Sequence, residues 1–301
     1  MYDQVAQNKR RSILLIAAFA LFTALVLVAV AYGFGLGSWG IAIAVLGAAA
    51  LSFGAYWRSD AVALRVSRAV PADPEAHARY HNLVEGLCIA SGLPKPRLYI
   101  IDDPAPNAFA TGRSPDHAAI AVTSGLLDKM NRVELEGVLA HELSHIKNYD
   151  ILVSTLAIIM VGAITLIADL SWRFHWRSGH RRRDSNGGGG PQAIMAVVGV
   201  LLIIVGPIAA RLMHLAISRR RETLADFSAV EMTRYPPGLV AALHKLQHDS
   251  TVVRSGSRAT AHLWIEDPMA QRQSEGNWSK LNRLFNTHPP LEERIAALEE
   301  L

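Results

Sequence analysis

The stretch VLAHELSHIKNYD, Val138 to Asp150, continues directly into the apolar run ILVSTLAIIMVGAITLIA, Ile151 to Ala168. The first part contains the pattern HExxH, which on a helix is typical of a zinc site. The second part contains no charged residue, and its length is near the lower limit for crossing a bilayer. Together they predict a zinc site held close to a membrane surface.

Two histidines of this stretch have the spacing of metal ligands. His141 and His145 stand at positions i and i+4, so on a helix both rings project from one face, about 6 Å apart along the axis. Glu142 is rotated by roughly 100° from His141. Its carboxylate is therefore free to hold the metal's water and take its proton rather than bind the metal. We predict His141 and His145 as zinc ligands and Glu142 as the catalytic base.

A catalytic zinc site needs a third protein ligand and an open fourth position. The best candidate is Glu222, in the segment SRRRETLADFSAV, because Asp226 follows it by one helical turn. Asp226 is predicted to accept a hydrogen bond from the non-coordinating nitrogen of a ligand histidine, which fixes the tautomer of that ring. Without the HELSH motif, the same two residues would be interpreted as charged surface residues of a helix.

The amino-terminal part of the chain is the most apolar. Hydrophobic residues make up 50% of the sequence and charged residues 19%, which points to a membrane protein. No Asp, Glu, Lys or Arg occurs from Ser12 to Trp57, too long a segment for one helix in a hydrocarbon core of ~30 Å. It predicts two spans, Ile13 to Tyr32 and Trp39 to Trp57. The alternatives are a buried hairpin of a soluble protein and, for the first span, a secretory signal peptide, although its apolar run is longer than a signal core.

A later apolar run, Ala193 to Ala210, is similar in length to Ile151 to Ala168. These two runs either span the membrane fully or form a tilted or re-entrant pair, because their length does not decide between the two. The expected fold is an α-helical membrane protein with about four membrane-inserted helices and an α+β metal-binding domain. The expected segments are a membrane hairpin at 1–57, the first part of the metal-binding domain at 58–150, a second membrane hairpin with an arginine-rich loop at 151–217, and the second part of the domain at 218–301.

The polar stretch between the two hairpins has the composition of a soluble domain. Its apolar spacing predicts a helix over Pro71 to Ser91 and short strands over Arg97 to Ile101 and Ala118 to Thr123. Asn131 is the predicted N-cap of the next helix, with Glu134 as its partner in a capping box. The zinc helix should therefore begin at Asn131.

Two further features of the composition narrow the class of protein. The single cysteine, Cys88, excludes an internal disulfide framework and is interpreted as a packed small hydrophobe. The net charge of +4 comes from scattered arginines rather than from one basic cluster, so we expect no nucleic-acid partner.

The motifs HELSH and SRRRETLAD belong to a longer ordered series. The chain resembles, over nearly its whole length, the HtpX-like membrane zinc metalloproteases, which are relatives of the CAAX prenyl proteases. The resemblance implies a zincin domain of gluzincin type that binds one zinc ion through His141, His145 and Glu222, with Glu142 as catalytic acid and base. The other matching segments are DDPAPNAFATG at 102–112, AVTSGLL at 121–127, ATAHLWIEDP at 259–268 and FNTHPPLEERIAAL at 285–298.

The resemblance also suggests where substrate binds. Asn107, Ala108, Phe109 and Gly112 would lie beside the cleft, and the following strand, Ala118 to Thr123, would be the sheet edge that receives substrate. An exposed edge can add an extended peptide through backbone hydrogen bonds, with little demand on side-chain identity.

Two residues of the carboxyl-terminal motif are further candidates for the site. His288, in NTHPP, either donates to the oxyanion or belongs to a helix start that Pro289 and Pro290 fix. Arg294 is implied as a structural partner of the site.

The resemblance implies a membrane-bound zinc endopeptidase of the bacterial inner membrane. Its substrates would be misfolded or damaged membrane proteins and unfolded polypeptides, as part of quality control and the stress response. The alternatives are a prenyl-peptide protease, which would need a larger intramembrane chamber, and a catalytically idle membrane scaffold or chaperone.

Positive charges predict which way the protein faces. The residues Lys9 to Arg11 precede the first span, and Arg58 and Arg65 follow the second, so the positive-inside rule places the zinc site on the cytoplasmic side. If both later runs cross, the arginine-rich loop from Arg173 to Gln192 lies outside, against that rule. If they re-enter instead, it stays inside.

Overall fold

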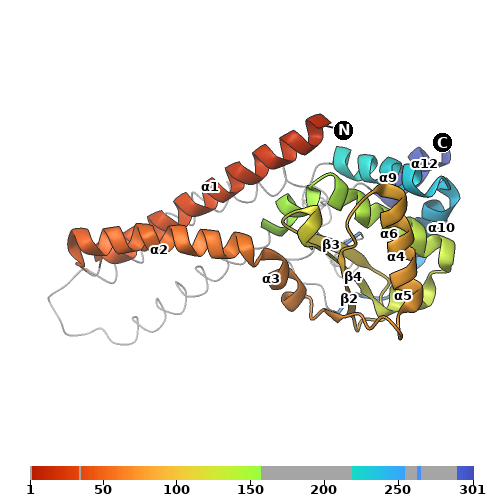
Figure 1. Cartoon of the computed structure of the whole chain (residues 1–301), viewed down its shortest axis with the longest axis horizontal. Helices are drawn as coiled ribbons and strands as arrows, with labels where there is room; N and C mark the ends of the chain where they lie inside the picture. Colours follow the sequence, from red (N-terminus) through yellow and green to blue (C-terminus); the bar gives the residue numbers. More distant parts are fainter. Residues whose placement is uncertain (1, 34, 157–218, 255–262, 266–289) are drawn as a thin grey trace, which may run out of the picture.

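The computed structural model of the 301-residue chain describes residues 2–33, 35–156, 219–254, 263–265 and 290–301. It shows a long helical hairpin attached to a compact mixed α/β body (Figure 1). The predicted run Ala193 to Ala210, most of Ile151 to Ala168, the arginine-rich loop and His288 lie outside the described residues.

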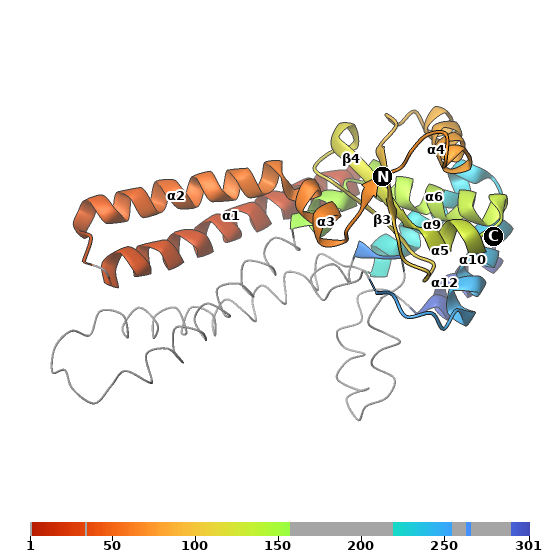
Figure 2. The same cartoon turned by 90° about the horizontal axis from the view of Figure 1, so that it is seen from below.

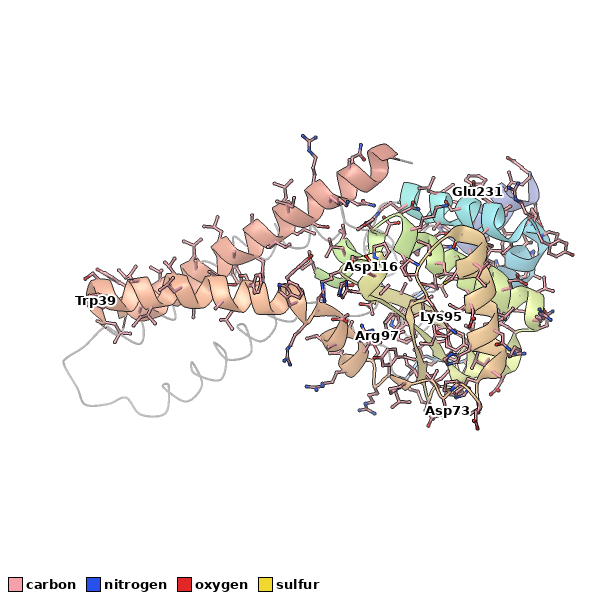
Figure 3. All side chains as sticks on the ribbon, viewed as in Figure 1. Trp39, Asp73, Lys95, Arg97, Asp116 and Glu231 are labelled. Atoms are coloured by element: carbon pink, nitrogen blue, oxygen red, sulfur yellow. The ribbon has the colours of Figure 1, made fainter. Side chains whose placement is uncertain are left out.

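Two long helices form the hairpin: α1 (Tyr2–Gly33) and α2 (Gly37–Trp57). The segments Ala6–Ala29 and Gly37–Trp57 are apolar and long enough to cross a membrane, and 22% of each apolar window is buried. Side chains project outward along the hairpin, with Trp39 at its far end, while the labelled charged residues all lie on the compact body (Figure 3). Helices in the core of a soluble domain would be mostly buried, so these apolar faces fit a lipid environment better.

The short helix α3 (Ser59–Val66) leads from the hairpin into a four-stranded sheet. The strands are β1 (Val70–Pro71), β2 (Arg97–Ile101), β3 (Ala108–Gly112) and β4 (Ala118–Thr123), arranged in the order β1-β2-β4-β3. β4 runs parallel to β2 and antiparallel to β3, which precedes it through the short helix η1 (Pro115–His117). The predicted strands β2 and β4 are confirmed. The prediction that β4 is a sheet edge is wrong, because β3 pairs with it along its whole length.

The helix predicted from Pro71 begins later, as α4 (Ala78–Ser91). Pro71 instead pairs with Tyr99 in the sheet. Beyond it, the Asp73 carboxylate accepts hydrogen bonds from the backbone N–H groups of Glu75 and Ala76, both at 2.9 Å. Such a side-chain turn holds the backbone out of a helix, and for this reason the predicted start was too early.

The helix that carries HELSH is α6 (Arg132–Lys147), and its start confirms the predicted capping box. The Asn131 side chain accepts from the Glu134 N–H at 3.0 Å, and the Glu134 carboxylate accepts from the Asn131 N–H at 2.8 Å. The helix does not continue into the apolar run. Tyr149 has a left-handed φ of 60°, and helical structure resumes at Asp150. α6 and the described helical start of the apolar run, residues 150–156, are therefore two helical segments joined by a bend.

α6 lies at the centre of the compact body, between the sheet and the other helices (Figure 2). Against it pack α4, α9 (Arg219–Thr233) and α10 (Pro236–His248), while α5 (Ser124–Lys129) and α12 (Leu291–Glu299) add side chains to the same core. Gly137 permits a close crossing with α10, since a Cβ atom there would lie 2.7 Å from the Leu239 nitrogen. The core joins both parts of the chain, and α9 lies along α6. This packing brings Glu222 to the two histidines.

Candidate active site

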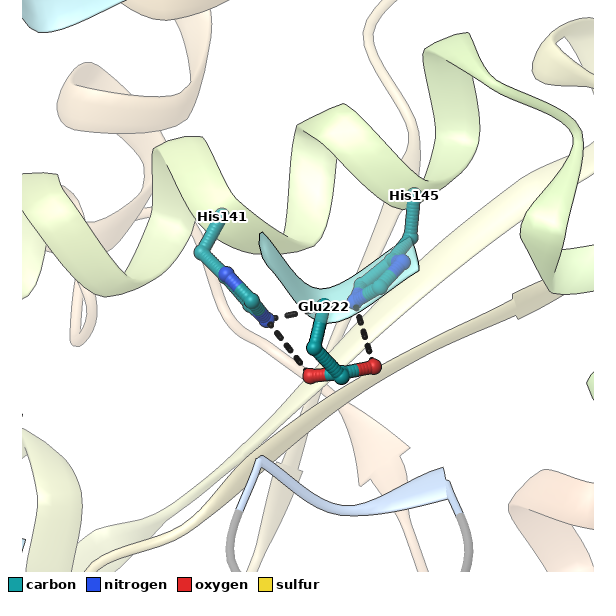
Figure 4. Close-up of side chains that lie close together, drawn as sticks. All are labelled: His141, His145 and Glu222. Atoms are coloured by element: carbon teal, nitrogen blue, oxygen red, sulfur yellow. Dashed lines mark hydrogen bonds and ion pairs between the residues drawn. The ribbon is translucent and has the colours of Figure 1, made fainter. Parts of the chain in front are cut away.

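The predicted ligands His141, His145 and Glu222 come together in the structure (Figure 4). The Nε2 atoms of the two histidines lie 3.1 Å apart. The Glu222 oxygens Oε2 and Oε1 lie 3.6 Å from Nε2 of His141 and of His145, respectively. Two successive turns of α6 and the first turn of α9 thus aim three donor atoms at one point.

These separations are close to the needs of zinc, with the two histidines reaching different oxygens of the Glu222 carboxylate. Ligand atoms about 2.0 to 2.2 Å from a tetrahedral ion lie roughly 3.3 to 3.6 Å from one another. Two imidazole nitrogens and one carboxylate oxygen are also the donor types that zinc binds in hydrolytic sites. The three side chains could therefore hold a zinc ion with little rearrangement, and the ion would keep a fourth position open.

Asp226 lies behind His141. Its Oδ1 atom is 2.8 Å from Nδ1 of His141, and Arg294 donates to both of its carboxylate oxygens, at 2.8 and 2.6 Å. All three side chains are buried. The bond at Nδ1 leaves Nε2 of His141 as the nitrogen that faces the ligand cluster.

Opposing effects act on the pKa values of this pair. Burial and the Arg294 charge act to lower the pKa of His141, but its hydrogen bonds to Asp226 and Glu222 outweigh them and raise it to about 9. Burial acts to raise the pKa of Asp226, but Arg294 and His141 hold it below its usual value. Asp226 is therefore a permanent carboxylate behind His141 at neutral pH.

Glu142 lies beside the ligands without being one of them. It lines the same cavity as His141, His145 and Glu222, and its side chain is buried. Burial raises its pKa, and the backbone N–H of Ala110 donates a hydrogen bond to it. A carboxylate with a raised pKa that touches the metal pocket suits a group that takes up and returns a proton.

Asp150 is a member of the site that the sequence did not suggest. Its Oδ2 atom lies 3.2 Å from Nδ1 of His145, the position that Asp226 occupies behind His141. The bend at Tyr149 turns the chain so that Asp150 returns toward the helix it has just left. The only signal in the sequence was a carboxylate shortly after HELSH, and its use depends on that bend.

The substrate segment implied by the resemblance is itself a strand, β3, at the edge of the sheet. Its outward-facing backbone is partly occupied. The Ala108 carbonyl accepts from the Ile265 N–H at 3.0 Å, and the Gly112 N–H donates to Oγ1 of Thr155 at 3.3 Å. The side-chain oxygen of Asn107 accepts from the Ala108 N–H at 3.0 Å. The edge is thus β3 rather than β4, and Ile265 covers one of its hydrogen-bonding positions.

Phe109 and Gly112, two of the implied substrate residues, make packing contacts within the fold. The Phe109 ring is fully buried on the sheet face away from α6, where it packs edge-on against Trp264 at a centroid distance of 4.9 Å. Gly112 has a φ of 146°, and a Cβ atom there would lie 2.5 Å from the His117 carbonyl oxygen. A side chain at this position would displace the backbone, so close packing explains why the residue is a glycine.

A buried carboxylate beside a three-ligand metal pocket suits metal-assisted hydrolysis, in which it can take the proton of an attacking water. Together with the apolar hairpin and the family match, this chemistry identifies the class: the protein is a membrane-bound metalloprotease. The chain belongs to peptidase family M48, whose profile matches residues 74–301.

Individual relatives agree with this family. The chain is 42% identical over 303 residues to a protein named Protease HtpX homolog from Caldanaerobacter subterraneus subsp. tengcongensis, covering 100% of this chain and 98% of that protein. It is 41% identical over 302 residues to a protein of the same name from Ligilactobacillus salivarius, covering 100% of both. The fold resembles the crystal structure of S. mikatae Ste24p, with a TM-score of 0.51 and 19% identity, over 99% of this chain and 67% of that one.

The contact between Asp226 and His141 makes a prediction for metal affinity. We expect Asp226→Asn to weaken zinc binding by roughly 10- to 100-fold, the usual effect of losing the carboxylate behind a ligand histidine. Competition with a chromophoric chelator measures this. Glu231→Gln, an exposed residue on the same helix, is the matched control and should bind zinc like the wild type. An unchanged affinity in Asp226→Asn would show that Asp226 does not support the ligand.

Proposed function

We propose that the protein is a zinc-dependent endopeptidase of the bacterial inner membrane. It would cleave exposed, extended segments of misfolded or damaged membrane proteins and serve quality control under stress. The observation that carries the proposal is the position of the buried Glu142 side chain, which lines the same pocket as His141, His145 and Glu222. The names of the relatives and the membership of family M48 support it.

Each residue of the pocket has a part in the proposed reaction. His141, His145 and Glu222 would hold zinc, which supplies Lewis-acid activation of water and of the peptide carbonyl. Glu142 takes the proton from the attacking water and passes it to the nitrogen of the leaving amine. Its raised pKa brings its proton affinity closer to that of the groups with which it exchanges protons. Asp226 and Asp150 keep the two imidazole rings in orientation.

The edge strand β3 would align the substrate. Thr123 donates to the Asn107 carbonyl, so Asn107 directs its backbone toward β4, and alternation directs Ala108 and Ala110 outward. Ala110 lines the cavity, next to Glu142. We propose that an extended peptide pairs with β3 beside Ala110 by backbone hydrogen bonds, and that it displaces the contacts that the Ala110 N–H makes with Glu142 and the Ala108 carbonyl makes with Ile265. Such pairing requires an extended, unfolded backbone and makes little demand on the side chains of the substrate.

We further propose that the chain carries four membrane-inserted segments and follows the division 1–57, 58–150, 151–217 and 218–301. The two described hairpin helices support the first part. The zinc site would then face the cytoplasm, because the basic residues that flank the first hairpin favour that side. A site held at the membrane surface would meet damaged membrane proteins through its location.

Cysteine labelling tests the orientation. Glu75 is exposed on the compact body, and Trp39 is 82% exposed at the hairpin tip. In a Cys88→Ser background, we expect a membrane-impermeant maleimide to label Glu75→Cys only in inside-out vesicles and Trp39→Cys only in intact cells. The opposite labelling pattern would reverse the proposed orientation.

A cleavage assay on the purified full-length protein tests the function. We expect casein to be cut, the activity to disappear with a zinc chelator, and added zinc to restore it. A zinc-loaded protein that leaves casein intact would indicate an idle scaffold. Cleavage confined to prenylated peptides would indicate a prenyl-peptide protease instead.

A further inference from the structure

The amino-terminal part of α1 contacts Asp150, a residue that lines the proposed zinc pocket. Asn8, near the start of α1, donates from its side-chain nitrogen to Oδ1 of Asp150 at 2.7 Å. The other oxygen of Asp150 lies 3.2 Å from Nδ1 of His145. We propose that Asn8 is a positioning residue of the metal site, which holds Asp150 so that Asp150 can orient His145. The inference rests on the proposed zinc site.

Both hydrogens of the Asn8 amide nitrogen are used at this place. The nitrogen also donates to the Asn148 carbonyl at 2.8 Å, so both hydrogens go to the bend that follows α6. Asn8 and Asp150 are each 3% exposed. Burying an amide and a carboxylate is costly unless each finds partners. If Asn8 served only to pack α1 against the bend, an apolar side chain would do so without the cost of burying an amide.

Both ligand histidines are supported in the same manner. Asp226 lies behind His141 and is held by Arg294, whereas Asp150 lies behind His145 and is held by Asn8. The guanidinium of Arg221 is a further neighbour, at 3.5 Å from Oδ1 of Asp150. Among the described residues, the support of His141 comes from the compact body. The support of His145 depends in part on α1.

Other contacts fix α1 at this place. Nζ of Lys9 lies 4.6 Å above the ring of Tyr149, the residue whose left-handed conformation makes the bend. Beyond the bend, Leu15 packs against an apolar cluster of Leu152, Val153 and Leu156. The helix therefore holds the chain on both sides of Asp150, and Figure 1 shows its amino-terminal end beside the compact body. A shift of α1 would move Asp150 relative to His145.

Zinc affinity and cobalt spectroscopy test the proposal on the full-length protein in detergent. Asn8→Leu keeps a side chain of similar size but removes both donors. We expect it to weaken zinc binding roughly 10-fold or more, within the range found for partners of ligand histidines. We also expect altered ligand-field bands of the cobalt(II)-substituted protein, because the orientation of His145 changes. Asp150→Asn should change both readouts in the same direction.

Ser12→Ala is the matched control. Ser12 is buried on the same helix, but its hydroxyl donates only to the Asn8 carbonyl within α1 among the described contacts. It should leave zinc affinity and the cobalt spectrum unchanged. Should Asn8→Leu fail to fold, Asn8→Asp also removes the donors at nearly constant size and is expected to weaken zinc binding similarly.

The outcomes separate this inference from the proposed function. Stoichiometric, tight zinc in the wild type with unchanged affinity and spectrum in folded Asn8→Leu or Asn8→Asp would overturn the role of Asn8 alone. A wild type that binds no zinc would overturn the proposed function and this inference with it. An equal loss in Ser12→Ala would show that α1 acts only through packing, which also overturns it.

Discussion

Changing Glu142 to glutamine is expected to slow peptide hydrolysis by about 10²- to 10⁴-fold, the usual contribution of a general base, while zinc stays bound. The amide has the shape of the carboxylate and can still accept the Ala110 N–H, but it cannot take a proton from water. Glu142 is not one of the three residues grouped as metal ligands. Casein cleavage and metal content should be measured on the same purified sample.

Glu136→Gln provides the comparison for Glu142→Gln. Glu136 lies on the same helix, is partly exposed and does not line the cavity. It should keep both activity and zinc. If Glu142→Gln lost its zinc, Glu142 would have to be a ligand. If it kept full activity, another group would have to be the base.

Replacing Glu222 with alanine is expected to remove metal and activity together. Two histidines alone hold zinc poorly, so affinity should fall by more than the roughly 10- to 100-fold expected for Asp226→Asn. Zinc also stabilises the fold that binds it, by about 2.7 kcal/mol at a concentration 100 times its dissociation constant. Added zinc should therefore raise the melting temperature of the wild type and leave that of Glu222→Ala nearly unchanged.

Glu231→Gln serves again as the control on α9, because its side chain is exposed. Its melting temperature should respond to zinc as that of the wild type does. A zinc-dependent rise of normal size in Glu222→Ala would mean that the third ligand is another residue.

The parts of the site that follow from local geometry were predictable. The i and i+4 spacing on a helix suffices to place His141 beside His145, and the capping box at Asn131 follows from the residue types at its two positions. The prediction of Glu222 as a ligand depended on the sequence motif around it, because the packing of α9 on α6 is a tertiary contact between distant parts of the chain. The turn at Asp73 illustrates the opposite case, in which a side chain overrides the apolar spacing that predicted a helix.

The errors have tertiary causes. Strand order is not visible in one sequence, so the segment beginning at Ala108 was interpreted as lying beside the edge rather than forming it. Asp150 was missed because the bend at Tyr149, which requires an uncommon backbone conformation, cannot be deduced from spacing. Asn8 was missed for a further reason, since its amide lies near a predicted membrane span and acts on a domain far along the chain.

X-ray absorption at the zinc edge of the purified full-length protein would identify the metal and its ligands. We expect about one zinc ion per chain, bound by two imidazole nitrogens and by oxygen atoms at roughly 2.0 to 2.2 Å, with no sulfur ligand. In His145→Ala the same shell should be lost. A wild-type protein without stoichiometric zinc, or with zinc in a shell that lacks the two imidazoles, would contradict this expectation.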